Sequence, residues 1–518
     1  MQDGTGNTTY TYDALDRKLG VRIQNSLRTT YSYDAVGRRS KTLAPIAAAG
    51  TSTPVTYSYD GAGRRTSVFN SGGNAAFFSY DANDRRVNDR TGSGIVVTTT
   101  VYDAADRVIG LSSTVPNDNL TITNYTYRYD NTTNRVGATE VDGSLVTWSY
   151  DNTYQLIGEQ RTDAGGSTTL TYNTTYTYDA VGNRLVKWDS GALTTSTYDV
   201  ANQLQTSVSS AGVTTYTFDL TGNQQIVATP SGITTTTWDN ENRQTHVTRP
   251  AGAANSFSYN ADGQRYLAQN SSGKTLFVWD GQALLGLGGV SSGNPTSVNY
   301  LVMQEPETFG GLISVISTFT GTPVYYIFDA LGSMVNQWQG SGLSGTAAYK
   351  AFGEILKSSG ATYSDIGSPF LWNAKYGYWY DADLGSYHAG EREMLALIGR
   401  WTKKDPTGLG PDINPFRVVG NNVVVLNDPA GLFVDSLTCA CPRGASSVGF
   451  FLVIPLGSRC TPAAVAVNKP IARQQCCNSP ATCWGLSGIL VGNCAKGKFS
   501  VLSWVDDCLV FPDLSPIG

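Results

Sequence analysis

The chain has 518 residues, which exceeds three times the usual domain length of roughly 150 and predicts about two to four domains. Charged residues make up only 15%, while glycine reaches 56 residues and tyrosine 29, a composition that favours turns and extended strands over long helices. The formal charge of -5 gives no positive field for nucleic acid, and the apolar stretches are shorter than the roughly 18 residues of a membrane span, so neither kind of partner is expected.

A repeat of about twenty residues fills the first half of the chain. Its signature is an aromatic residue followed by Asp or Asn. The aromatic residue recurs at Tyr12, Tyr33, Tyr59, Tyr80, Tyr102, Tyr129, Tyr150, Tyr178, Tyr198, Phe218, Trp238, Tyr259 and Trp279. A second aromatic residue usually stands two places earlier, and this spacing puts both rings on one face of a strand.

A turn signal and then Arg follow the dipeptide in many repeats, as in Asp34-Ala-Val-Gly-Arg38 and Asp103-Ala-Ala-Asp-Arg107. Asp can accept hydrogen bonds from the backbone N–H groups ahead of it, and Gly or Asp tolerates positive φ at the next corner. Each repeat is therefore predicted to be strand, tight turn, strand, with its Asp and Arg in structural roles. Because one hairpin is only marginally stable alone, the hairpins are predicted to stack into one long antiparallel sheet of an all-β protein.

The segment after the repeats carries further motifs in a fixed order. They are Tyr326-Ile-Phe-Asp-Ala-Leu-Gly-Ser333, Tyr349-Lys-Ala-Phe-Gly-Glu354, Tyr376-Gly-Tyr-Trp-Tyr-Asp-Ala-Asp-Leu-Gly385, Gly399-Arg-Trp-Thr-Lys-Lys-Asp-Pro406, Val419-Gly-Asn-Asn422 and Asp428-Pro-Ala-Gly-Leu432. Together with the Tyr-Asp repeats, they make residues 1–432 resemble the YD or Rhs (rearrangement hot spot) repeat proteins, which include C subunits of insecticidal Tc toxins and teneurins. The resemblance implies that repeats at 1–285 wind into a hollow β-shell and that a repeat-associated core at 286–432 closes one end.

The same resemblance implies an activity. In toxin members the shell encloses a variable C-terminal segment, which the core cuts off after the Leu of a second Asp-Pro-x-Gly-Leu motif. The matching bond here joins Leu432 to Phe433, and the candidate catalytic residues are Asp405 and Asp428, with Arg392 as their electrostatic partner. Two carboxylates held close together can share a proton and activate water for peptide hydrolysis. Asp-Pro-x-Gly is also an ordinary turn signature, so the alternative is that both copies only shape loops.

The last 86 residues, Phe433 to Gly518, have a different composition. They hold all eight cysteines, at Cys439, Cys441, Cys460, Cys476, Cys477, Cys483, Cys494 and Cys508, and no histidine. Eight cysteines in 86 residues favour a small Cys-rich domain at 433–518 linked by disulfides, with a zinc tetrathiolate as the competing interpretation. A catalytic Cys would need a basic partner such as His, which this segment lacks. No metal, cofactor or further catalytic motif is expected.

Three functions fit these features. The first is a toxin-like Rhs protein whose partners are its own C-terminal segment, an export machinery and an immunity protein. The second is a cell-surface adhesion or carbohydrate-binding protein without enzymatic activity, in which accessible rings stack on sugars. The third is a structural shell with no activity. Disulfides predict a secreted or cell-surface location, and because Met1 opens directly into a repeat without a visible export signal, the chain is expected to be an N-terminally truncated fragment.

Overall fold

The computed structural model describes residues 2–3, 6–23, 27–44, 54–70, 72–92, 95–271, 273–289, 298–359, 369–408, 412–432, 481–482, 489–495 and 498–505. Strands dominate this part of the chain, so the predicted all-β class is confirmed. Its helical segments are short 3-10 helices: η1 (Pro116–Asp118), η2 (Pro250–Gly252), η3 (Ala374–Tyr376) and η4 (Val419–Asn421). No helix within the described ranges is long and apolar enough to cross a membrane.

One antiparallel sheet of 33 strands runs through the described residues up to position 359, and each strand pairs with the next along the chain. The strands are β1 (Gln2–Asp3), β2 (Gly6–Tyr12), β3 (Lys18–Ile23), β4 (Leu27–Tyr33), β5 (Arg39–Leu43), β6 (Pro54–Tyr59), β7 (Arg65–Asn70), β8 (Ala75–Tyr80), β9 (Arg86–Thr91), β10 (Val96–Tyr102), β11 (Val108–Val115), β12 (Leu120–Tyr129), β13 (Arg135–Thr139), β14 (Leu145–Tyr150), β15 (Leu156–Thr162), β16 (Tyr172–Tyr178), β17 (Arg184–Asp189), β18 (Ala192–Tyr198), β19 (Leu204–Ser209), β20 (Gly212–Phe218), β21 (Gln224–Thr229), β22 (Gly232–Trp238), β23 (Gln244–Thr248), β24 (Ala254–Tyr259), β25 (Arg265–Asn270), β26 (Gly273–Asp280), β27 (Ala283–Gly289), β28 (Tyr300–Gln304), β29 (Leu312–Ser317), β30 (Pro323–Phe328), β31 (Met334–Gln339), β32 (Gly342–Tyr349) and β33 (Ile355–Ser359).

The Asp side chain builds the turn in most repeats. Asn260 does so in the twelfth repeat, while Asp280 of the last repeat binds Lys18 and Tyr31 instead. In the first repeat, Asp13 Oδ1 accepts the backbone N–H groups of Leu15 and Arg17, at 2.9 and 3.0 Å. Asp13 Oδ2 pairs with the Arg17 guanidinium at 2.7 Å. The residue before the Arg has positive φ, as at Asp16 (57°) and Gly37 (87°), which suits the Asp and Gly found there. The prediction that the repeated Asp and Arg serve the turn is confirmed.

The repeated tyrosines and tryptophans link their hairpins to the one before, whereas Phe218 has no polar atom for such a link. The Tyr80 hydroxyl donates to the backbone carbonyl of Arg65, in the preceding repeat, at 2.7 Å. The guanidinium of Arg64, from the preceding turn, lies over the same ring, 4.9 Å from its centroid. A tryptophan keeps this link through its indole, because Trp238 Nε1 donates to the carbonyl of Gln224 at 3.0 Å. Consecutive hairpins are therefore joined by side chains as well as by the backbone ladder.

A bulge recurs at the same place in every hairpin. In the pair β2/β3 the register shifts between Thr11 and Tyr12, and the shift returns at each of the thirteen repeated aromatic residues. Bulges bend a strand and increase its twist. Repeated once per hairpin, they supply the bending that a sheet needs to close on itself.

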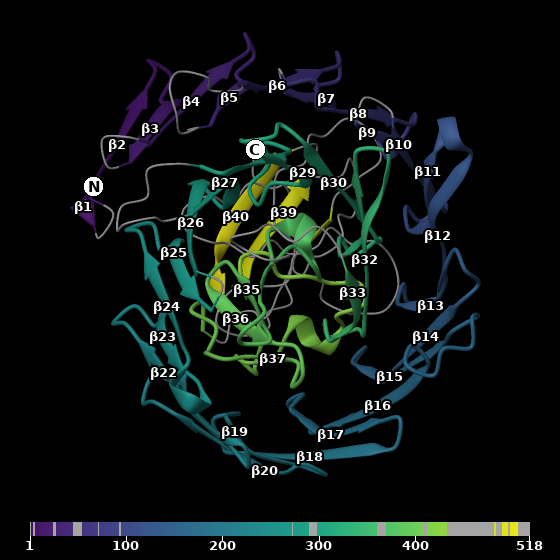
Figure 1. Ribbon diagram of the computed structural model, residues 1–518, viewed down its shortest axis with the longest axis vertical. Coiled ribbons are helices and arrows are strands. Elements are labelled where there is room, and N and C mark those ends of the chain that lie inside the picture. Colours follow the sequence, from purple (N-terminus) through teal and green to yellow (C-terminus); the bar gives the residue numbers. More distant parts are fainter. Residues whose placement is uncertain are drawn as a thin grey trace.

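The sheet curls into a spiral of slightly more than one turn (Figure 1). Strands β2–β25 follow a ring, and β26–β33 run inside the arc that β2–β15 form. Long-range contacts join the two layers. The Tyr31 hydroxyl donates to Asp280 Oδ1 at 2.8 Å across 249 positions of sequence, and Arg86 pairs with Glu305 at 2.7 Å across 219 positions. The first strands of the sheet are thus the outer layer of a double wall.

Apolar side chains fill the space between the two layers. Tyr57 and Phe78 of the outer layer form one buried cluster with Leu301 and Met303 of the inner layer. A second cluster repeats this arrangement further along, where β10 and β11 meet β30 and β31. The overlap therefore buries core on both sides of the inner strands, which explains why β28 has no exposed position.

A second antiparallel sheet lies inside the ring. It consists of β34 (Trp379–Asp381), β35 (Ser386–Ala389), β36 (Arg392–Leu395) and β37 (Arg400–Trp401). Buried ion pairs attach it to the wall, because Arg265 of β25 lies 2.8 Å from Asp381 and 3.0 Å from Glu393. The large core cluster of the described residues spans the wall and this inner sheet. The inner sheet is the element that positions the candidate site.

The tail is described only in part. Strands β38 (Ala481–Thr482), β39 (Ile489–Ala495) and β40 (Lys498–Val505) pair antiparallel, and β39 and β40 project inside the ring in Figure 1. Cys494 belongs to β39, while the other seven cysteines and all cysteine side chains lie outside the described residues. The expected disulfides and the Cys-rich domain therefore stay predictions. The same holds for the expected boundaries at 285 and 432.

Candidate functional site

The three predicted site residues come from separate segments of the inner part of the chain. Arg392 opens β36, Asp405 follows β37, and Asp428 follows η4. All three side chains are buried. What brings them together is the path of the chain around the inner sheet.

The segment 412–422 is held against the turns of the repeats. At four of these turns the Arg position holds a buried amide instead: Asn134, Gln155, Asn183 and Asn223. Asn421 Nδ2 donates to Gln155 Oε1 at 3.0 Å, and Asn422 Nδ2 donates to Asn134 Oδ1 at 3.1 Å. Asn414 Nδ2 donates in the same way to Asn183 Oδ1 at 2.7 Å. In three of these turns, the amide side chain at the Arg position therefore accepts a hydrogen bond from an asparagine of the segment 412–422.

Two backbone segments touch where the second Asp-Pro-x-Gly motif meets the turn between β35 and β36. A Cβ atom on Gly390 would lie 2.2 Å from the Ala430 carbonyl oxygen, and one on Gly431 would lie 2.3 Å from the Ala389 carbonyl oxygen. Both glycines have positive φ, 51° and 63°. The Glu391 N–H donates to the Ala430 carbonyl at 2.9 Å. Glycine at these two positions therefore lets the motif lie directly against the start of β36.

Arg392 joins the two aspartates into one buried cluster. Its Nη2 atom lies 2.7 Å from Asp428 Oδ2 and 3.0 Å from Asp405 Oδ2. The three side chains are between 2% and 7% exposed, so water screens these ion pairs little. The Trp401 ring lies 4.3 Å from the guanidinium carbon. The two carboxylates and the arginine that the sequence singled out are in direct contact.

The carbonyl group of the expected scissile bond lies beside this cluster. Asp428 Oδ1 accepts the N–H of Leu432 at 3.0 Å, and the Tyr378 hydroxyl donates to the Asp428 carbonyl at 2.9 Å. Thr407 Oγ1 lies 3.3 Å from the Leu432 carbonyl oxygen and 2.5 Å from Asp405 Oδ1. Phe433, on the other side of the bond, lies outside the described residues.

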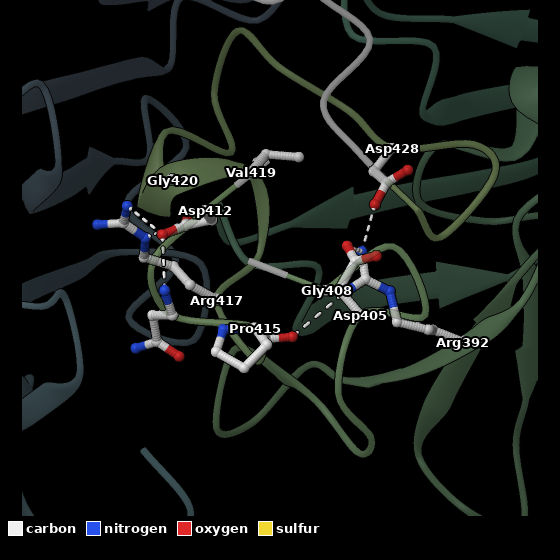
Figure 2. Close-up of a pocket in the computed structure, with 10 residues that line it drawn as sticks. Arg392, Asp405, Gly408, Asp412, Pro415, Arg417, Val419, Gly420 and Asp428 are labelled. Atoms are coloured by element: carbon white, nitrogen blue, oxygen red, sulfur yellow. Dashed lines mark hydrogen bonds and ion pairs between the residues drawn. The ribbon is translucent and has the colours of Figure 1, made fainter. Parts of the chain in front are cut away.

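Burial raises the pKa of the Asp405 carboxyl above its ordinary value, although Arg392 and hydrogen bonds from Thr407 act in the opposite direction. A small pocket opens beside this carboxyl. Figure 2 shows Arg392, Asp405 and Asp428 on one side of the pocket and the ion pair of Asp412 with Arg417 on the other. The site therefore holds two acid groups, Asp405 and Asp428, near the Leu432 carbonyl. Burial favours the protonated form of Asp405, and the pocket beside it has space for a small molecule.

The sequence missed two polar residues of this site. Thr407 occupies the variable position of the first Asp-Pro-x-Gly motif, and Tyr378 lies in the aromatic motif that precedes β35. Neither motif indicates that these hydroxyls reach the second Asp-Pro-x-Gly. No group of three or more His, Cys, Asp and Glu side chains suited to a metal ion occurs among the residues that the structure describes.

Comparisons with known proteins agree with the observed architecture. No family model matches the chain. Toxin subunit YenC1 from Yersinia entomophaga is 28% identical over 154 residues, which are 28% of this chain and 15% of YenC1. A structure of the Tc holotoxin pore from Photorhabdus luminescens is similar with a TM-score of 0.58 and 19% identity, over 83% of this chain and 22% of the matched chain.

A crystal structure of TcdB2-TccC3 matches 82% of this chain and 28% of its own, with 16% identity and a TM-score of 0.40, which is too low to add to the argument. The chain thus spans a quarter or less of YenC1 and of the holotoxin chain. At these levels of identity the structural likeness shows the fold, a repeat-built β-shell, and the YenC1 match adds a shared stretch of sequence.

Proposed function

We propose that this RHS/YD-repeat protein, which shares its fold and part of its sequence with Tc toxin subunits, is a β-shell that encloses its own variable C-terminal segment and releases it by cutting the chain after Leu432. Residues 1–285 form the repeat wall, 286–432 the core that closes it, and 433–518 the released segment. The observation that carries the proposal is the contact of Arg392 with Asp405 and Asp428 next to Leu432, whose N–H donates to Asp428 and whose carbonyl oxygen lies against Thr407.

The chemistry is hydrolysis by two carboxyl groups in different protonation states. Asp428 takes a proton from water as the water oxygen bonds to the carbonyl carbon of Leu432. Asp405, which burial favours in its protonated form, protonates the carbonyl oxygen. The bond to the Phe433 nitrogen then breaks as that nitrogen takes the proton from Asp428, and the new carboxyl group returns the other proton to Asp405. Arg392 keeps the two carboxyl groups at the distance that this exchange needs.

The shell retains the tail after the cut, in keeping with the view in Figure 1, where β39 and β40 project inside the ring. The protein acts as part of a toxin-like assembly that is secreted or displayed at the cell surface, with an export machinery and an immunity protein as further partners. The competing adhesion hypothesis needs accessible rings for sugars. In the wall, however, repeated rings such as Tyr80 are half-buried and already covered by arginine, which gives that hypothesis no support.

Two substitutions test the cut. The full chain should appear on denaturing electrophoresis as two pieces, the smaller with 86/518 of 55.4 kDa, which is about 9 kDa. Asp405→Asn and Asp428→Asn keep the size of each side chain but remove its acid, so each should leave the chain whole over the time in which the wild type is cut completely. Asp118→Asn is the control, because Asp118 lies in η1 and does not line this pocket. It should be cut like the wild type.

An uncut wild-type chain would refute self-cleavage and leave the core as a closure of the shell. Cutting of Asp405→Asn and Asp428→Asn at the wild-type rate would instead assign the cut to another protease. Melting temperatures of the three variants, measured on the same preparations, separate loss of chemistry from loss of the fold.

A further inference from the structure

The hydroxyl group of Thr407 faces two acceptors at once. Its Oγ1 atom lies 2.5 Å from Asp405 Oδ1 and 3.3 Å from the carbonyl oxygen of Leu432. The second oxygen of Asp405, Oδ2, is taken by Arg392. Thr407 is thus the residue that connects the buried acid to the carbonyl group of the bond to be cut.

Part of this geometry is ordinary turn chemistry. In the turn of the seventh repeat, Thr153 Oγ1 donates to Asp151 Oδ1 at 2.8 Å, and the Thr153 N–H donates to the same oxygen at 2.8 Å. Thr407 repeats both contacts with Asp405. What distinguishes Thr407 is the carbonyl oxygen of Leu432, which reaches it from 25 residues away. A turn by itself does not require that third contact.

A hydroxyl group has one hydrogen to donate, and it can accept another hydrogen at the same oxygen. When Asp405 is ionised, the Thr407 hydrogen satisfies the carboxylate, and the Leu432 carbonyl receives nothing. When Asp405 carries its proton on Oδ1, that proton binds Thr407 Oγ1, and the Thr407 hydrogen is free to point to the Leu432 carbonyl. The state of the acid therefore decides whether the carbonyl receives a hydrogen bond.

We propose that Thr407 is a catalytic relay, which passes the proton of Asp405 to the carbonyl oxygen of Leu432 when water attacks. The inference rests on the self-cleavage proposed above. As the water oxygen bonds to the carbonyl carbon, the electron pair of the C=O π bond moves to the carbonyl oxygen. That oxygen takes the hydrogen of Thr407, and Thr407 takes the hydrogen of Asp405. When the C–N bond to Phe433 breaks, the carbonyl reforms and both hydrogens return.

Thr407→Val and Thr407→Ser test the relay in the full chain. Cell-free synthesis starts the reaction, and denaturing electrophoresis follows the uncut fraction with time. Loss of one donor to a developing oxyanion typically slows a reaction by about 10²- to 10³-fold in a buried site. Thr407 is exposed, so we expect a slowing of at least about tenfold in Thr407→Val. Thr407→Ser keeps the hydroxyl and should be cut within about threefold of the wild-type rate. Thr153→Val, which alters the same kind of turn elsewhere, should not slow the cut.

The pH profile gives a readout that a purely structural threonine would not change. Because the protonated form of Asp405 is the active one, the wild-type rate should fall as pH rises through the raised pKa of Asp405. Residual cutting in Thr407→Val does not use that proton, so its rate should lack this fall.

Equal rates and equal profiles for the wild type and Thr407→Val would overturn the relay and leave self-cleavage intact. An equal slowing in Thr407→Ser and Thr407→Val would also overturn it, because the hydroxyl would then not be the active feature. A wild-type chain that is never cut would refute the proposed function itself, and the relay with it.

Discussion

A single guanidinium serves two buried carboxyl groups in the candidate site, and the strand that carries it is fixed from its other face. Successive strand residues point to opposite sides, so Arg392 faces the two aspartates while Glu393 faces away. Glu393 pairs with Arg265 of the wall at 3.0 Å and with the His388 ring at 3.0 Å. Arg392 is therefore held in place by an ion pair that takes no part in the cluster.

Glu159 is a second buried acid, and it ties the wall to the inner layer. Its Oε1 atom accepts the N–H of Ala351 at 2.9 Å and the indole N–H of Trp148 at 3.2 Å. Burial raises the pKa of Glu159 from about 4.5 to about 7. A carboxyl group whose pKa is higher in the folded than in the unfolded chain lowers the free energy of unfolding as pH rises between those two values.

The stability of the wild type should therefore fall by about 3 kcal/mol between pH 4.5 and pH 7.5 on account of Glu159, since each unit of pKa shift corresponds to about 1.4 kcal/mol. Glu159→Gln removes the titration and should flatten this part of the profile. Melting temperatures across this pH range measure the effect. Glu241→Gln, at a side chain that is 70% exposed, is the control and should follow the wild type. A Glu159→Gln profile as steep as the wild type would contradict the assignment.

The sequence was enough to predict which side chains form the candidate site, but not all of the contacts that they make. Asp405, Asp428 and Arg392 stood in recognisable motifs, so their types and order were visible. Thr407 could not be identified as a site residue in this way, because its role depends on where the backbone of Leu432 passes. That position is set by close backbone approach at Gly390 and Gly431, and a pattern of residue types does not encode it.

The hairpin is the element that repeats, and its aromatic hydroxyl is the link between neighbours. The Tyr150 hydroxyl donates to the backbone carbonyl of Arg135 at 2.7 Å. Tyr150→Phe keeps the ring and removes this hydrogen bond, which is worth about 1 kcal/mol. We expect faster amide hydrogen exchange in the peptides that cover β13–β15, measured by mass spectrometry.

Tyr154 supplies a matched control four residues further along the chain. No hydrogen bond of its hydroxyl group occurs in the structure of the described residues, so Tyr154→Phe should leave exchange in β13–β15 unchanged. If Tyr150→Phe and Tyr154→Phe behaved alike, the repeated hydroxyl would not link the hairpins.

The period of the sequence was enough to predict the hairpins and the roles of their Asp and Arg residues, because turn chemistry is local. The bulge at each aromatic residue was not predicted. It arises where two residues such as Lys18 and Leu19 lie opposite Tyr12, and both strands must be paired before it exists. Because the bulges bend the strands, the curvature of the wall also could not be predicted from the repeat period of the sequence.

The double wall is a property of the whole molecule, and Glu305 is a buried charged residue that joins its two layers. Its side chain is 4% exposed and binds Arg65 and Arg86. Burial alone would raise its pKa, but Arg86 and Arg65 hold the pKa of Glu305 below its ordinary value. Residues so far apart in sequence meet only after the spiral has closed, so repeat patterns could not predict this contact.

Glu305→Gln should loosen the outer layer. Removing one partner from a buried ion pair typically costs about 3 to 5 kcal/mol, because the remaining charges stay buried without compensation. Limited proteolysis should then cut the connections between β6 and β9 sooner than in the wild type. Glu307→Gln is the control, because Glu307 also pairs with Arg65 but is 58% exposed and should contribute about 1 kcal/mol or less. Equal protease resistance in the two variants would argue against a closed double wall.

The most direct test of the account as a whole is a mass spectrum of one preparation of the wild-type chain, taken once under native and once under denaturing conditions. Self-cleavage with retention of the tail predicts a single native species of about 55.4 kDa that separates into pieces of about 46 and 9 kDa on unfolding, with the new ends at Leu432 and Phe433. One covalent chain of full mass after unfolding would contradict self-cleavage. A native species that lacks the smaller piece would contradict a shell that holds its own tail.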